Sequence, residues 1–220
     1  MTSRRVLAGA SSLLLAAVVT WFAGVRVNLS ASMPIGLYRV SRGPPAKGVM
    51  VLACLPGEVA VFARSRRYVP NGRCPGGTAP IGKVVLAAAG DSVEVTGEGL
   101  LVNGHLVRNT KPLAVDGAGQ SLPRFPDGTY VVGQDEVWLY SSYSKRSFDS
   151  RYFGPLPLSC VLNRVLPLWT LEYLQRDTTH GVSAAEPSRP QAHGTCPRSC
   201  VHAWDGLANI TRLLTTVHPS

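Results

Sequence analysis

Short hydrophobic segments separated by Gly, Pro and Asn predict a chain built mainly of β-strands. Residues 92–95 and 101–107 alternate between apolar and polar positions. The segment 49–53 is continuously apolar and 81–89 is apolar apart from Lys83, so both predict buried strands. Asn103-Gly104 divides the second alternating segment, which predicts a tight hairpin turn. Other predicted strands cover 36–40, 130–132, 137–140 and 161–171. The pattern favours a mainly β domain, either a folded sheet or a partly closed barrel.

An uninterrupted apolar run precedes this domain and predicts a membrane anchor. Residues 6–25 carry no charge, and twenty residues at about 1.5 Å each span the roughly 30 Å hydrocarbon core of a bilayer. A cleavable signal peptide shares the basic start, but its apolar region is usually shorter. We therefore expect an uncleaved anchor over 1–27. Arg4 and Arg5 favour a cytoplasmic N-terminus, with the domain on the other side of the membrane.

Length and composition indicate how many domains the chain can form, and its charge indicates which partners it can bind. The 220 residues, 45% of them hydrophobic, suffice for one folded domain, predicted over 28–176. Residues 177–220 begin with a stretch rich in Ser, Thr, Pro, Ala and Gly without apolar periodicity, which predicts a disordered tail. The net charge of +9 comes from scattered basic residues, so nucleic acid is not an expected partner.

The five cysteines leave at least one without an intramolecular partner. Cys54 and Cys74 flank a loop-rich stretch and form the candidate disulfide, although two unpaired thiols remain the alternative. Cys196, Cys200 and His202 supply only three ligands in the predicted tail. We therefore expect no metal site.

A serine and a lysine are the candidate catalytic residues. Ser32 follows the apolar run by seven residues, and Lys83 lies in the apolar segment 81–89. A serine hydroxyl attacks an amide only if a base removes its proton. Four of the five histidines lie in the predicted tail and His105 falls at a hairpin, whereas burial of a lysine favours its neutral, basic form. The alternative is that Lys83 reaches solvent and Ser32 merely ends the anchor.

Three motifs together resemble the membrane signal peptidases that use a Ser–Lys dyad. The segment 30–34, Ser-Ala-Ser-Met-Pro, is similar to the family's serine box. The segment 83–91 resembles its lysine box, with Gly-Asp at the end, and 147–154 resembles its Ser-x-Asp-Ser-Arg-Tyr-x-Gly box. Pro-Ile-Gly-Leu-Tyr at 34–38 and Cys-Pro-Gly-Gly at 74–77 indicate the TraF-type, conjugative-transfer branch. The resemblance covers roughly 1–171.

This resemblance implies a mechanism without cofactor or metal. Ser32 would attack the scissile carbonyl to form an acyl-enzyme, and neutral Lys83 would accept the Ser32 proton and deliver it to the leaving amine. Ser30 would support the oxyanion together with the Ser32 backbone N–H. Ser147 would orient the lysine amine.

The resemblance also assigns the charged pair of the third box. Asp149 matches an acidic residue required in this branch, and pairing with Arg151 would fix the box beside the lysine. A purely structural ion pair is the alternative.

The resemblance implies that the substrate is presented by the membrane. The expected substrate is a membrane-inserted pilin precursor of a conjugative type IV secretion system, matured by hydrolysis or by cyclisation, and the enzyme would lie in the bacterial inner membrane with its catalytic domain in the periplasm. Two alternatives stay open. One is a general signal peptidase that acts on secreted preproteins; the other is a non-catalytic, membrane-anchored assembly component.

Overall fold

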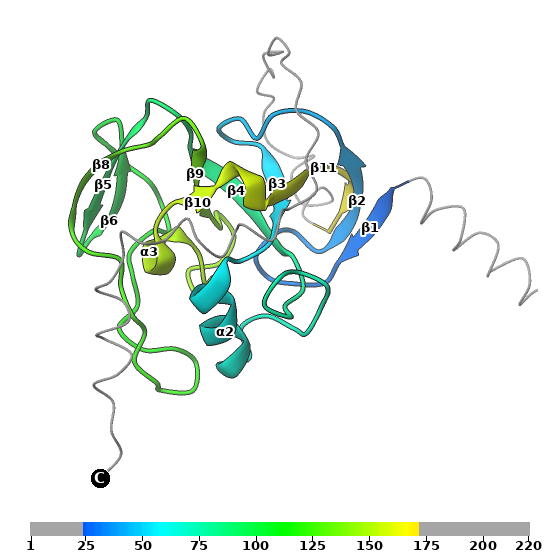
Figure 1. The fold of residues 1–220 in the computed structure, drawn as a ribbon, viewed down its shortest axis with the longest axis horizontal. Coiled ribbons are helices and arrows are strands. Elements are labelled where there is room, and N and C mark those ends of the chain that lie inside the picture. Colours follow the sequence, from blue (N-terminus) through cyan, green and yellow to red (C-terminus); the bar gives the residue numbers. More distant parts are fainter. Residues whose placement is uncertain (1–23, 172–220) are drawn as a thin grey trace, which may run out of the picture.

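The computed structural model describes residues 24–171, which form a mainly β fold with two short α-helices (Figure 1). The helices are α2 (Gly57–Ser65) and α3 (Ser150–Phe153), and a 3-10 turn covers Leu158–Cys160. The strands are β1 (Val25–Asn28), β2 (Gly36–Ser41), β3 (Met50–Ala53), β4 (Ile81–Ala87), β5 (Ser92–Thr96), β6 (Gly99–Val102), β7 (His105–Leu106), β8 (Gly128–Val131), β9 (Glu136–Tyr140), β10 (Leu156–Pro157) and β11 (Val161–Thr170).

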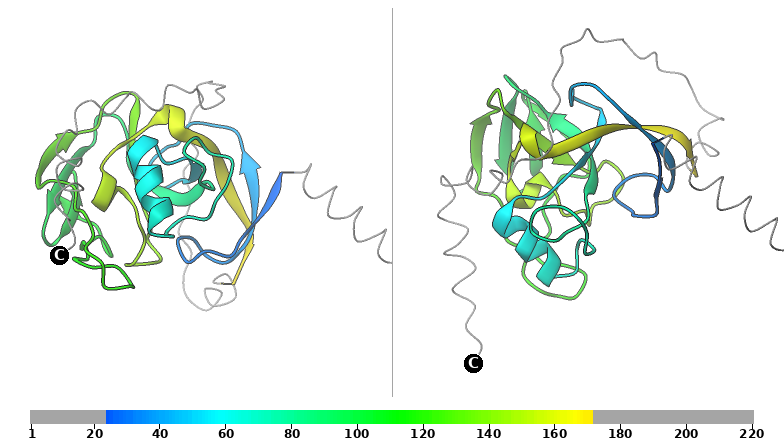
Figure 2. Two further views of the ribbon diagram at one scale, coloured as in Figure 1. Left: turned by 60° about the horizontal axis from the view of Figure 1, so that its bottom comes forward. Right: turned by 45° about the vertical axis from the view of Figure 1, so that its right-hand side comes forward.

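These strands form two sheets that lie side by side, as both views of Figure 2 show. The larger sheet has seven strands in the order β1-β2-β11-β3-β4-β9-β10, and the smaller has four in the order β7-β6-β5-β8. The prediction of a mainly β fold is confirmed. The larger sheet is not closed, because β1 and β10 lie at its opposite edges, so the folded-sheet form of the prediction describes it better than a barrel.

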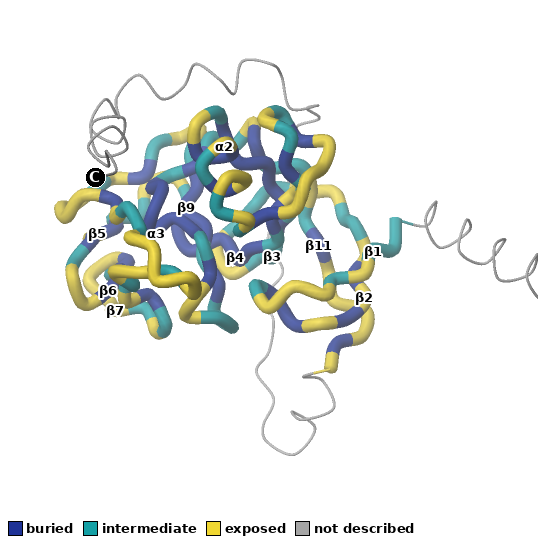
Figure 3. The backbone as a smooth tube through the Cα atoms, turned by 90° about the horizontal axis from the view of Figure 1, so that it is seen from below, coloured by how far each residue is buried: buried dark blue, intermediate teal, exposed yellow. Residues whose placement is uncertain are grey.

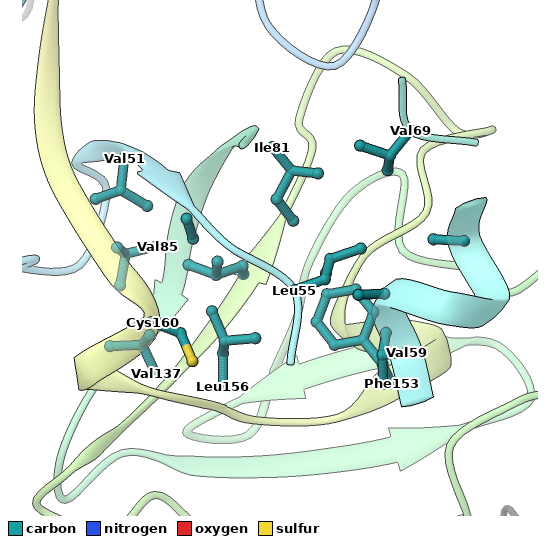
Figure 4. Close-up of a cluster of buried hydrophobic side chains, with 14 residues drawn as sticks. Val51, Leu55, Val59, Val69, Ile81, Val85, Val137, Phe153, Leu156 and Cys160 are labelled. Carbon is teal, nitrogen blue, oxygen red and sulfur yellow. The ribbon is translucent and has the colours of Figure 1, made fainter. Parts of the chain in front are cut away.

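The main hydrophobic core lies between the larger sheet and α2 (Figure 4). Val51 and Val85 come from neighbouring strands, Val59 comes from the helix, and Phe153 comes from α3. A second buried cluster around Trp138 joins the two sheets. The buried segments of the chain lie at the centre of the domain, whereas the loops at its rim are largely exposed (Figure 3). Among the described residues, strands β4 and β9 are mostly buried.

Local predictions agree with the structure at one turn and at one disulfide. Asn103 and Gly104 both have positive φ, 52° and 79°, as a tight hairpin between β6 and β7 requires. Cys54 and Cys74 form a disulfide, which confirms the predicted pair. The bond closes the segment that contains α2 and ends shortly before β4.

Helix α2 was not expected from the sequence. It has only nine residues, follows Pro56 and begins with Gly57, a poor helix former, so its helical pattern is too short to stand out. Tertiary packing of Val59, Ala60 and Ala63 against the core accounts for its presence.

The predicted terminal segments lie mostly or wholly outside the described residues. Of the anchor predicted over 1–27, only its last four residues are described, and Val25–Asn28 form β1. Between residues 24 and 171 there is no helix long and apolar enough to span a membrane. The tail predicted over 177–220, with Cys196 and Cys200, lies beyond the described part of the chain.

Candidate active site

Lys83 is buried in the middle of the larger sheet. It lies on β4 opposite Val51 of β3, and only 3% of its surface is exposed. Because side chains alternate along a strand, Lys83 shares a face with Ile81 and Val85, both members of the main hydrophobic core. The prediction of an apolar environment is confirmed, and the alternative, an ammonium group in solvent, is not what the structure shows.

This burial changes the acidity of Lys83. Loss of hydration disfavours the ammonium form and lowers the pKa of Lys83 from 10.5 to about 8. The negative charge of Asp149 raises this pKa and the positive charge of Arg151 lowers it, but both effects are smaller than that of burial. Within residues 24–171 no hydrogen bond or ion pair holds the Lys83 amine. A sizeable fraction of Lys83 is therefore neutral near pH 8.

Ser32 lies on the connection between β1 and β2. Its side chain is partly buried, and its neighbour Met33 is 3% exposed. The Met33 side chain packs against Gly82, where a Cβ atom would clash with the methionine methyl carbon. Glycine before Lys83 therefore allows the serine-bearing loop to lie directly against β4.

Asn28 organises this loop, which the sequence did not lead us to expect. Its amide nitrogen donates to the carbonyl oxygens of Ser30, Met33 and Pro34, each at 3.0 Å. Its side-chain oxygen accepts from the Ser30 N–H at 3.1 Å and from the Ser30 hydroxyl at 2.7 Å. A polar residue three positions after the apolar N-terminal run was the available signal. In this structure the Ser30 hydroxyl therefore bonds to Asn28.

Ser147 comes from the third sequence box and lies near Ser32. Its side chain is buried, and its Oγ lies 3.5 Å from the Ser32 Oγ, at the long limit of a hydrogen bond. The described residues show no hydrogen bond from Lys83 to Ser32 or to Ser147. Catalytic hydrogen bonds are often long in a free enzyme and tighten on substrate binding, so the Ser–Lys dyad stays a prediction.

Asp149 and Arg151 form a fully buried ion pair. Arg151 Nε donates to one carboxylate oxygen at 2.7 Å and Nη2 donates to the other at 2.9 Å. The remaining guanidinium bonds go to the carbonyl oxygens of Asn109, Lys111, Lys145 and Ser147. Both carboxylate oxygens of Asp149 are thus occupied, and the predicted pairing of these two residues is present.

Asp91, the last residue of the lysine box, has a structural role. Its carboxylate accepts from the Ala88 N–H at 3.1 Å and from the Asn103 side-chain amide at 2.6 Å. These bonds tie the end of β4 to the hairpin of the smaller sheet. The Gly-Asp motif therefore fixes the turn that follows the lysine strand.

Other catalytic arrangements find little support in the described residues. His105 is the one histidine among them, and it lies exposed on β7 of the smaller sheet. In the same part of the chain no group of three or more His, Cys, Asp and Glu side chains is placed to hold a metal ion. Activation by a neutral lysine therefore stays the expected route to a serine nucleophile.

Comparison with known proteins assigns the family. The family model described as "Signal peptidase, peptidase S26" matches residues 3–169. The chain therefore belongs to the S26 signal peptidase family and is a serine peptidase of the signal peptidase type.

Related sequences place it more narrowly, in the TraF type of this family. A plasmid transfer protein TraF of Escherichia coli is 44% identical over 167 residues, covering 75% of this chain and 93% of that protein. A probable conjugal transfer protein TraF of Sinorhizobium fredii is 42% identical over 174 residues, covering 74% of this chain and 90% of that protein. These names support a peptidase-like role in conjugation.

A structural comparison gives a weaker similarity. The crystal structure of a signal peptidase I from Enterococcus faecalis is 17% identical in sequence and aligns with a TM-score of 0.33. The alignment covers 57% of this chain and 100% of that chain. The family assignment rests on the sequence matches.

Proposed function

We propose that the protein is a membrane-anchored endopeptidase that uses Ser32 as nucleophile and Lys83 as general base to mature a conjugative pilin precursor. The burial of Lys83 carries this proposal. An amine with a pKa of about 8 loses its proton readily, whereas an exposed lysine would stay charged. Ser32 attacks the scissile carbonyl, its proton passes to Lys83, and Lys83 protonates the leaving amine. Water then attacks the acyl-enzyme and releases the hydrolysed product. If an amine of the substrate itself attacks instead, the product is cyclic.

The surroundings of Ser32 support the remaining roles. The Ser147 hydroxyl, 3.5 Å from the Ser32 hydroxyl, is placed to orient the nucleophile. The Ser30 hydroxyl would have to leave Asn28 to join the Ser32 N–H in stabilising the oxyanion. Asp149 and Arg151 hold the backbone that carries Ser147, since Arg151 Nη2 donates to the Ser147 carbonyl oxygen at 2.8 Å.

An apolar surface next to Ser32 supports cleavage at the level of the bilayer. The strands β1, β2 and β11 pair so that Val27, Leu37 and Trp169 form one row, and all three side chains are exposed. Leu29 and Ile35, on the serine loop itself, are also exposed. An apolar patch of this kind is typical of a surface that contacts a membrane or a partner. We therefore propose that the domain lies against the periplasmic face of the inner membrane, next to the predicted anchor.

Two substitutions test the dyad. Ser32→Ala and Lys83→Ala are each expected to abolish processing of the pilin precursor of the same transfer system, while the protein stays folded and membrane-bound. Normal maturation by either variant would disprove the assignment.

The breadth of the substrate range needs a separate experiment. Deletion of the gene, followed by a survey of secreted proteins, is expected to leave all precursors except the pilin correctly processed. Accumulation of many secreted precursors would instead show a general signal peptidase.

A further inference from the structure

A buried hydroxyl next to Lys83 holds the nucleophile loop in place. Ser141 is the first residue after β9, which pairs with β4 through Tyr140 opposite Val84. Extending this register by one residue brings Ser141 beside Lys83. Ser141 is fully buried, and its hydroxyl donates to the carbonyl oxygen of Ser32 at 2.8 Å.

The direction of this hydrogen bond is fixed by two others. The Ser141 oxygen accepts from the backbone N–H groups of Tyr143 and Ser144, at 3.3 and 3.1 Å. A serine hydroxyl has one proton and two acceptor positions. Because both acceptor positions are occupied by N–H groups, the single proton points to the Ser32 carbonyl.

The same residue is connected to the third sequence box. The Ser141 N–H donates to Asp149 Oδ2 at 3.2 Å, and the turn that its hydroxyl stabilises begins the loop leading to Ser147. Ser141 thus joins the strand end beside Lys83, the loop that carries Ser147 and the backbone of Ser32. The sequence analysis did not single it out.

We infer that Ser141 is a positioning residue, whose hydroxyl sets where the Ser32 side chain stands relative to Lys83 and Ser147. This inference rests on the proposed Ser–Lys dyad. Without the hydrogen bond, the loop keeps its contacts through Asn28 and Met33 but loses its direct tie to the strand end beside the base. A displacement of about 1 Å at a reacting group can cost roughly 100-fold in rate.

The test compares full-length variants in their cleavage of the pilin precursor, at a temperature where each is folded. Ser141→Ala is expected to lower kcat by about 10- to 100-fold with little change in KM. Ser141→Thr keeps a hydroxyl and should retain most of the activity. Ser142→Ala is the matched control, because in the described residues the Ser142 hydroxyl makes no hydrogen bond and its carbonyl merely accepts from Asn109.

Further measurements separate positioning from folding and from the proposed chemistry. Ser141→Cys keeps the size of the side chain but donates hydrogen bonds weakly, so it should fold and be as impaired as Ser141→Ala. The pH at which activity falls on acidification should not move, since burial sets the Lys83 pKa. Wild-type kcat in Ser141→Ala or in folded Ser141→Cys would overturn the inference. Cleavage by Ser32→Ala would instead refute the dyad itself.

Discussion

Two basic side chains are buried near each other in this domain, and their surroundings shift the two pKa values in opposite directions. Lys83 and Arg151 are 3% and 1% exposed. Arg151 is paired with the Asp149 carboxylate and also donates to four carbonyl oxygens, and the ion pair raises its pKa. Lys83 has no hydrogen-bond partner among the described residues, and its pKa falls to about 8.

The difference shows that burial alone does not decide the charge of a basic side chain. Desolvation lowers the pKa of both side chains, but for Arg151 the hydrogen bond and the charge of Asp149 outweigh it. Arg151 therefore remains a charged structural residue. Around Lys83 the charge of Asp149 offsets only part of the desolvation, which costs stability and keeps the amine suited to act as a base.

The largest expected effect concerns activity and separates the two residues most clearly. Lys83→Met removes the proposed base and should abolish processing, yet it should stabilise the fold at pH 7 by about 1–3 kcal/mol, because an uncompensated buried charge disappears. Pilin processing and thermal unfolding of the purified protein measure the two effects. An active Lys83→Met variant, or one that is strongly destabilised, would contradict the comparison.

The second prediction concerns the paired cation. Arg151→Met leaves Asp149 as an unpaired buried carboxylate and removes four carbonyl contacts, so it should destabilise the fold by about 3–5 kcal/mol. Urea unfolding compared with Lys83→Met checks this. If both variants changed stability in the same direction, the two sites would not differ as described.

The third prediction follows from the titration of Lys83. Between pH 8 and 10.5 the unfolded chain holds the lysine proton and the folded chain does not, so stability should rise with pH in this window. The rise should amount to about 3 kcal/mol at most, measured as the difference between wild type and Lys83→Met. A constant difference across this window would show that Lys83 is not perturbed.

The same titration should govern catalysis. Because the base must be neutral, kcat/KM should fall about tenfold per pH unit below pH 8. An acid limb near pH 6.5 or below would show that another group acts as the base.

The smallest expected effect tests how the charge of Asp149 changes the pKa of Lys83. Asp149 raises the pKa of Lys83, so Asp149→Asn should move the acid limb of kcat/KM to lower pH. Asp91→Asn is the matched control, because Asp91 ends the lysine box but has no influence on this pKa. A shift to higher pH in Asp149→Asn would contradict the stated cause.

Much of the fold could be predicted because its strands carry local signals. Apolar runs marked β3 and β4, and Asn103-Gly104 marked the hairpin. Helix α2 was missed because it is short and depends on packing rather than on propensity. Whether the sheet closes depends on pairing between distant strands, and no local pattern reports that.

The candidate site was only partly predictable for a similar reason. Ser32, Lys83 and the third box were identified by motif, and the apolar run correctly predicted burial of the lysine. Asn28 and Ser141 were missed because their importance lies in hydrogen bonds to backbone groups. Such bonds are made by the fold, and an isolated asparagine or serine gives no sign of them in a sequence.

The most direct test of the central claim is to map the acyl group by mass spectrometry after rapid mixing of the full-length protein with the pilin precursor. The account predicts an ester on Ser32 in the wild type and none in Lys83→Ala. An adduct on another residue, or acylation of Ser32 at the wild-type rate in Lys83→Ala, would contradict it.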